Sequence, residues 1–168
     1  ILAVCVALVG CAVPRPHEDV AGSLGYRRVD GKELRLDLYR PRGITRPPVI
    51  VWFHGGGWRI GDKRVRLLIR DLTRDGFAVA SVQYRLSTRA QWPAQQEDCL
   101  TAIHWLKAHG TELGIDASRM ALAGDSAGGH LAALCGLKEG RPSIRAVLAI
   151  YPPTDLVELA EYHHDPAY

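Results

Sequence analysis

Residues 124–128 limit the possible folds of this chain more than any other segment. They read Gly-Asp-Ser-Ala-Gly and lie between an apolar stretch at 120–123 and a segment of helical periodicity at 126–137. A G-x-S-x-G sequence between a buried strand and a helix is typical of a very tight turn, which strains the backbone of the serine and exposes its side chain. Ser126 is therefore the candidate nucleophile. The alternative is a turn whose small residues serve packing alone.

Strand and helix patterns alternate through most of the chain. Continuous apolar runs, typical of strands buried on both faces, occur at 49–53, 77–82 and 146–150. Helices are predicted at 64–75 and 93–109, and each is followed by a glycine that ends it. This order predicts an α/β fold in which a mostly parallel sheet is covered by helices on both faces.

The part of the chain that precedes these strands predicts an antiparallel hairpin. Leu34, Leu36 and Leu38 alternate with the charged residues Arg35 and Asp37. Because side chains in a strand point to opposite faces in turn, the leucines share one face, and we expect Arg35 and Asp37 to face solvent.

A second glycine-rich segment, His-Gly-Gly-Gly-Trp at 54–58, directly follows an apolar strand. Consecutive glycines let backbone N–H groups point at one spot without side chains in the way, as stabilisation of the oxyanion of a tetrahedral intermediate requires. Gly56, Gly57 and Ala127 are the predicted donors. A phosphate-binding loop is the alternative, but the sequence lacks the Lys-Ser/Thr pair of a P-loop and the third glycine of a dinucleotide-binding loop.

Both motifs and several shorter segments resemble the α/β-hydrolase superfamily, in particular its HGGGW-bearing carboxylesterases and lipases of the hormone-sensitive-lipase-like and bacterial feruloyl-esterase-like branches. The shorter segments are Gly61-Asp62-Lys63, Gln83-Tyr84-Arg85-Leu86, Trp92-Pro93-Ala94-Gln95 with Asp98, and Gly114-Ile115-Asp116. The resemblance covers residues 29–162. It implies the α/β-hydrolase fold and a Ser-Asp/Glu-His triad in that chain order, with Ser126 as nucleophile and His54 structuring the oxyanion loop. Asp125 is expected to order the same loop, because neighbours at such a turn point apart.

The acid and the base of the triad have few candidates here. Those that follow the nucleophile in the implied order are Asp155, Asp165, His163 and His164. In the superfamily the acid and the base each follow a later strand, and these histidines come too soon after Asp155. We therefore expect both groups beyond residue 168, in a missing C-terminal part of the fold, and an open sheet edge at 146–150. His130 is expected to pack or to make a surface hydrogen bond.

Residues 1–13 are uncharged and too short to cross a membrane as a helix of ~20 residues, but they fit the apolar region of a secretory signal peptide. Residues 8–11, Leu-Val-Gly-Cys, resemble the bacterial lipobox, whose cysteine receives lipid. We therefore expect residues 1–10 to be a partial lipoprotein signal peptide, Cys11 to be a lipid anchor on a membrane, and 11–24 to be a tether. The protein would then be an exported bacterial lipoprotein on the periplasmic or cell-surface face. The alternative is an ordinary signal peptide that contains a cysteine.

Residues 25–168 are expected to form the N-terminal portion of one domain, because a chain of 168 residues has a common single-domain size. A formal net charge of +3 with scattered basic residues implies no nucleic-acid partner, and the four cysteines lack the spacing of a zinc site. From the serine turn, the glycine-rich loop and the family resemblance, we predict a serine hydrolase of small-molecule carboxylic esters that needs no metal or organic cofactor. The alternatives are an arylformamidase or peptidase on the same fold and a non-catalytic binding protein.

Overall fold

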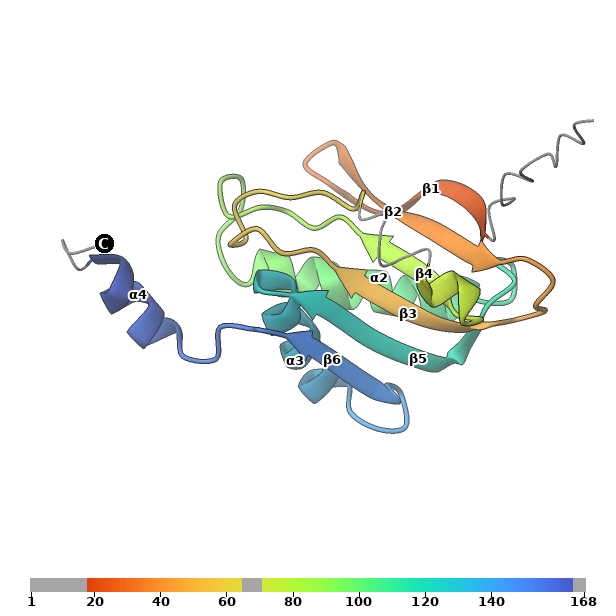
Figure 1. Cartoon of the computed structure of the whole chain (residues 1–168). Helices are drawn as coiled ribbons and strands as arrows, with labels where there is room; N and C mark the ends of the chain where they lie inside the picture. Colours follow the sequence, from red (N-terminus) through yellow and green to blue (C-terminus); the bar gives the residue numbers. More distant parts are fainter. Residues whose placement is uncertain (1–17, 65–70, 165–168) are drawn as a thin grey trace, which may run out of the picture.

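A computed structural model describes residues 18–64 and 71–164 of the chain (Figure 1). The predicted signal peptide at 1–10 and the predicted anchor Cys11 lie outside the described residues, as does Asp165. Within the described ranges, none of the helices has the length and apolar character that crossing a membrane requires.

The described residues form one six-stranded sheet in the order β1-β2-β4-β3-β5-β6. Its strands are β1 (Glu18–Val29), β2 (Lys32–Pro41), β3 (Pro48–Phe53), β4 (Ala78–Val82), β5 (Asp116–Asp125) and β6 (Ala146–Ile150), and the helices are α2 (Ala94–His109), α3 (Ala127–Glu139) and α4 (Leu156–His164). β1 and β2 run antiparallel to their neighbours, whereas β4, β3, β5 and β6 are parallel to one another. The predicted α/β fold with a mostly parallel sheet is confirmed.

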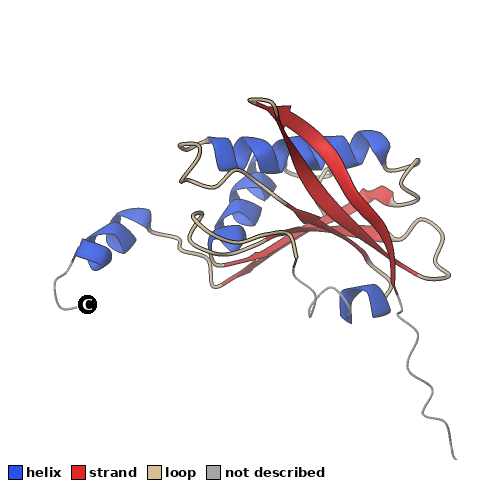
Figure 2. Ribbon diagram, turned by 90° about the horizontal axis from the view of Figure 1, so that it is seen from above, coloured by secondary structure: helices blue, strands red, loops and turns tan. Residues whose placement is uncertain are grey.

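Helices cover both faces of the sheet, as Figure 2 shows. α2 and α3 pack on one face, where side chains such as Leu36, Phe53, Ile103, Leu122 and Leu131 form the larger core. The opposite face carries a smaller core around Ile50, Trp52 and Val79, against which Leu72 packs. Leu72 belongs to a helical turn at 71–74, within the helix predicted at 64–75. The two separate cores explain why the parallel strands are apolar on both faces.

β5 begins at Asp116, earlier than the start at Met120 that hydropathy predicts. Asp116 pairs with Pro48 of β3 across a register shift. The early part of the strand is polar, and Arg119 Nε donates a hydrogen bond to Asp116 Oδ2 at 2.7 Å. An apolar pattern alone therefore misses the beginning of this strand.

The prediction that Asp37 faces solvent is wrong. Asp37 is only 8% exposed, and it alternates with Leu36 and Leu38, so that it lies on the face of the smaller core. Lys63 Nζ donates a hydrogen bond to its carboxylate at 2.6 Å. The loop that returns from segment 54–58 brings this lysine over the sheet, which supplies the counter-charge that a buried carboxylate requires.

β1 takes in residues 18–24, so the prediction of a tether over 11–24 is wrong for this part. These residues pair with β2 instead of leaving the domain. Gly22 lies in this part of the predicted tether, has a φ of 93° and falls at an irregularity in the pairing between Val20 and Ser23. The glycine therefore marks a bulge within a strand and does not mark a linker.

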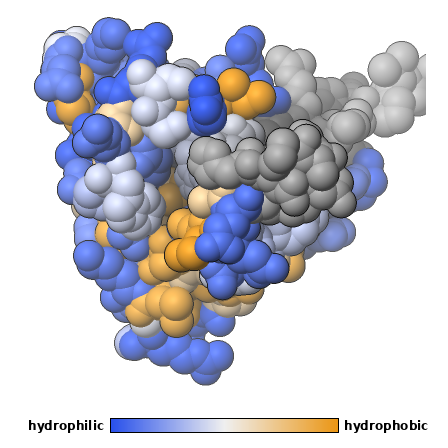
Figure 3. All heavy atoms as spheres, turned by 90° about the vertical axis from the view of Figure 1, so that its left-hand side faces the viewer, coloured by the Kyte–Doolittle hydropathy of each residue, from blue (hydrophilic) through white to orange (hydrophobic). Residues whose placement is uncertain are grey.

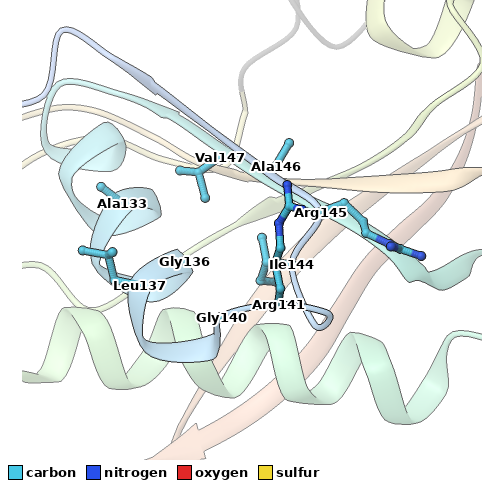
Figure 4. A pocket seen from close by; sticks show the side chains of 9 residues that line it. All are labelled: Ala133, Gly136, Leu137, Gly140, Arg141, Ile144, Arg145, Ala146 and Val147. Atoms are coloured by element: carbon cyan, nitrogen blue, oxygen red, sulfur yellow. The ribbon is translucent and has the colours of Figure 1, made fainter.

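β6 lies at the edge of the described sheet, as predicted, and it pairs only with β5 there. Val147 is 42% exposed and Leu148 57%. Next to this strand, an open apolar depression of about 460 Å³ lies between β6, α3 and the loop that joins them, with Leu137 and Ile144 among its lining residues (Figure 4). An uncovered strand edge flanked by apolar surface is a ready surface for pairing with further chain.

A buried carboxylate fastens β1, α2 and the segment after β4 together. The Asp98 side chain on α2 is fully buried, and Arg27 Nη1 on β1 donates to it at 2.5 Å. Arg85 donates through Nε at 2.8 Å, through Nη2 at 3.0 Å and through its backbone N–H at 2.9 Å. Both carboxylate oxygens are thus compensated, which an interior charge requires.

Removing this carboxylate should destabilise the fold. Asp98→Ala leaves the two guanidinium groups without their shared counter-charge, so we expect the free energy of unfolding to fall by about 3–5 kcal/mol. Urea denaturation followed by circular dichroism measures the loss. Asp71→Ala removes one partner of the exposed pair Asp71–Arg74 and should leave the urea midpoint nearly unchanged. Equal midpoints for the two variants would contradict a stabilising role for the Asp98 carboxylate.

Candidate active site

The candidate site lies at the carboxyl ends of the parallel strands, where open α/β sheets bind their ligands. Ser126 follows β5, and segment 54–58 follows β3. These strands are neighbours, with Phe53 paired to Gly124, and both end on the left of Figure 1. Two motifs that are far apart in the sequence are therefore adjacent in space.

Ser126 lies in a strained strand-to-helix turn. Its φ of 51° and ψ of −120° fall in a region that non-glycine residues rarely adopt, at a cost of order 1–3 kcal/mol. The turn is held from both sides, because Ser126 N–H donates to Ile150 O at 2.9 Å and Ser126 O accepts from His130 N–H at 3.0 Å. No described side chain caps the helix here. The Ser126 hydroxyl is thus left for another partner.

The glycines of this turn are required by close packing. A Cβ atom on Gly128 would lie 2.0 Å from Phe53 O, and one on Gly124 would lie 2.4 Å from the Gly128 carbonyl. Both contacts are with backbone, which cannot move aside as a flexible side chain can. The first turn of α3 therefore crosses the end of β3 at a distance that only glycine permits.

The predicted oxyanion loop also depends on glycine conformations. Gly56 and Gly57 have φ values of 114° and 57°, and Gly56 O accepts hydrogen bonds from the N–H groups of Arg59 and Ile60. Within the described part of the chain, the N–H groups of Gly56, Gly57 and Ala127 donate to no other residue. Three backbone donors at the turn are therefore available to a ligand.

Asp125 joins the two loops. Its Oδ1 accepts a hydrogen bond from Gly55 N–H at 3.1 Å, and a Cβ on Gly55 would lie 2.4 Å from its Oδ2. The carboxylate thus spans from the nucleophile turn to the start of the oxyanion loop. No hydrogen bond joins it to the Ser126 hydroxyl in the described structure.

The buried side chain of His54 supports the oxyanion loop through a hydrogen bond to its backbone. Its side chain is buried, and its Nδ1 lies 2.8 Å from Gly55 O, so Nδ1 carries the proton and donates to that carbonyl. Burial lowers the pKa of His54, which favours the neutral ring. Tyr84 stacks on this ring with centroids 4.3 Å apart, and its hydroxyl donates to His54 O at 2.7 Å. The sequence patterns do not identify Tyr84 as a site residue, although its segment after β4 carries part of the family resemblance.

The described residues place no acid or base against Ser126, since none of their side chains hydrogen-bonds to its hydroxyl. Asp155 instead caps α4, because its Oδ1 accepts from the N–H groups of Val157 and Glu158. His163 and His164 lie on the same helix, which projects away from the sheet in Figure 1. The structure therefore does not bring these candidates to the serine.

His130 packs against tryptophan. Its ring contacts that of Trp58 edge-on, with centroids 5.3 Å apart, and burial lowers its pKa. Trp58 follows the predicted oxyanion donors and itself has a positive φ of 58°. No cluster of three or more potential metal-binding side chains occurs within residues 18–64 and 71–164.

Known proteins with similar sequences and structures include esterases. The chain is 37% identical to a carboxylic ester hydrolase, LipN, of Mycobacterium tuberculosis over 91% of its own length and 42% of that protein. It is 33% identical to the esterase LipC of the same organism, with coverages of 80% and 37%. The chain thus spans about two fifths of the length of these curated relatives.

Solved structures give the same result. A bacterial heroin esterase is 36% identical, with a TM-score of 0.69 over 78% of this chain and 42% of that one. An esterase of Pyrobaculum calidifontis is 32% identical, with a TM-score of 0.73 over 84% and 48%. The BD-FAE family model matches residues 36–167. From this match and the esterase fold, the chain belongs to the BD-FAE family, within the α/β-hydrolase carboxylesterase group.

Proposed function

We propose that this protein hydrolyses carboxylic esters with Ser126 as the nucleophile. The observation that carries the proposal is the strained serine turn beside three free backbone donors, at Gly56, Gly57 and Ala127. Ser126 Oγ would attack the ester carbonyl, and the donors would stabilise the negative charge that develops on its oxygen. Collapse of the intermediate breaks the carbon–oxygen bond to the alcohol, and water then releases the acid from the serine.

The Ser126 hydroxyl proton must be taken up by a base, the histidine of the triad, which the triad's Asp or Glu orients. The described residues place neither group at Ser126. We propose that both come from chain beyond residue 168 in the whole protein. The greater length of the curated relatives supports this, as does the uncovered edge of β6 beside the site. Neutral, buried His54 is engaged with the Gly55 carbonyl and serves the loop instead.

An amide or arylformamide substrate would use the same nucleophile and the same donors, and a non-catalytic binding protein could keep the same fold. Ester hydrolysis is favoured because the relatives are named as esterases and carboxylic ester hydrolases. Profiling the whole protein with matched ester, amide and formamide substrates separates these activities.

We also propose that the whole protein is exported and held on a membrane through lipid on Cys11. The support is the uncharged stretch at 1–13, which contains the lipobox-like segment at 8–11 near its end. Acyl chains contribute ~0.8 kcal/mol per buried methylene, so the several chains of a bacterial lipoprotein hold a domain on a membrane.

Replacing the proposed anchor residue should release the protein. In a bacterium that expresses the complete gene, Cys11→Ser should abolish both palmitate incorporation and membrane partitioning, whereas the buried-thiol variant Cys135→Ala should retain both. Labelling with palmitate followed by membrane fractionation tests this. Lipid labelling that survives Cys11→Ser would contradict the proposed anchor.

Replacing the nucleophile should remove activity and leave the fold intact. In the whole enzyme, Ser126→Ala deletes one hydroxyl that no described side chain uses, and loss of a nucleophile of this kind costs ~10⁶ in turnover. Steady-state hydrolysis of short-chain aryl esters measures the effect. Activity within about tenfold of the wild type would exclude Ser126 as nucleophile.

Activity should depend on the backbone conformation of the oxyanion loop more than on the room for a side chain there. A Cβ on Gly57 meets nothing within 4 Å, but its φ of 57° disfavours branched side chains. Gly57→Val should therefore move the loop and lower kcat by about 10²–10³, with a smaller change in KM. Gly43 is a matched control, because it also has a positive φ, of 77°, and open space around the position of a Cβ. It lies in the turn between β2 and β3, away from the oxyanion loop. Similar losses of kcat for Gly43→Val and Gly57→Val would contradict the proposed donors.

A further inference from the structure

An aromatic cavity lies beside the proposed oxyanion loop. It has a volume of about 270 Å³, and its lining includes Gly57, Trp58, Trp92 and His130. Gly57 is one of the proposed oxyanion donors, and His130 lies one helical turn after Ser126, to whose carbonyl oxygen its N–H is bonded at 3.0 Å. A group bound in the cavity would therefore lie beside the oxyanion loop and the first turn of α3, which carries Ser126 at its start.

Three rings, those of Trp58, Trp92 and His130, form much of the cavity wall, and Arg59, Ser87 and Gln95 also line it. Trp58 meets His130 edge-on at 5.3 Å between centroids, and Trp92 meets it at a tilt with centroids 6.2 Å apart. Burial lowers the pKa of His130, which favours the uncharged imidazole. Figure 3 faces the end of the molecule at which the parallel strands finish, where hydrophobic side chains lie among hydrophilic ones.

Trp92 is placed to contact a ligand more than to support the fold. It is 55% exposed, whereas the tryptophan on β3, Trp52, is 3% exposed. Trp92 follows β4 in a loop at the same end of the sheet as Ser126. Truncation of its indole should therefore alter the cavity with little loss of stability.

The charge of the lining residues and the volume of the cavity limit which chemical groups of a ligand can bind there. Aromatic walls can bind cations, but Arg59 lines this cavity and no carboxylate of the described residues does, so a neutral group is favoured. Pockets that enclose a whole ligand measure ≈ 300–1,000 Å³. A cavity of about 270 Å³ suits one compact part of a substrate.

We infer that this cavity is a specificity subsite for a compact, neutral apolar group of the ester, and that Trp92 is the residue that determines selectivity for it. The inference rests on the proposed ester hydrolysis at Ser126. Trp92 and Trp58 both line the cavity, Trp58 directly after the oxyanion loop, and the rings of both contact that of His130.

Matched ester pairs on the full-length enzyme test the subsite on both sides of the ester bond. One pair varies the acyl part and consists of p-nitrophenyl cyclohexanecarboxylate and p-nitrophenyl acetate. The other pair varies the alcohol part and consists of cyclohexyl acetate and ethyl acetate. In one of these pairs, Trp92→Ala should lower kcat/KM for the ring-bearing ester by about tenfold and should change that of its small partner by less than about twofold. Trp92→Phe should retain the preference. Trp105→Ala is the control, because the ring of Trp105 also contacts that of a histidine, His109, but lies on α2 outside the cavity.

A ring preference that Trp92→Ala leaves unchanged in both pairs would overturn the subsite, whether or not the two esters of a pair lose activity together. A wild-type enzyme that hydrolyses no ester, acetate included, would overturn the proposed function and the subsite with it. Normal acetate hydrolysis with an unaltered ring preference would overturn the subsite alone.

Discussion

The approach of Gly128 to the carbonyl oxygen of Phe53 fixes the geometry of the whole site. A side chain at Gly128 would place a Cβ 2.0 Å from that oxygen, so the first turn of α3 can cross the end of β3 only where the chain is bare. The crossing forces Ser126 into its strained turn and brings segment 54–58 beside it. The sheet behind it has a core on each face and the buried Asp98 network at one side.

The site divides support from chemistry. The side chains of Asp125, His54 and Tyr84 form hydrogen bonds with backbone atoms of residues 54 and 55, so they hold the oxyanion loop in place. The groups left without a partner at the site include the Ser126 hydroxyl, the backbone donors around it, Trp58 Nε1 and His130 Nδ1. Electrostatic stabilisation by such donors depends on their being fixed before the reaction, because a loop that must reorganise weakens it.

The sequence predicts the fold well because strand and helix signals, glycine stops and two motifs agree. It fails where polar residues enter sheet structure. Asp37 is buried because Lys63 reaches it from a loop, and β5 starts in a polar segment, and neither fact follows from local hydropathy. A strand bulge at Gly22 resembles a linker in sequence. The roles of Tyr84 and Trp92 arise from contacts between distant segments, although both residues lie in segments that carry the family resemblance.

The central claim is that the strained serine is the reactive group, and covalent labelling tests it most directly. The full-length protein would be treated with a fluorophosphonate, and the modified peptide would be located by mass spectrometry. We predict one adduct, on Ser126, whose formation parallels the loss of ester hydrolysis, because phosphorylation of Ser126 Oγ blocks the nucleophile. An adduct on another serine that accounts for the lost activity, or full activity with Ser126 modified, would contradict the account.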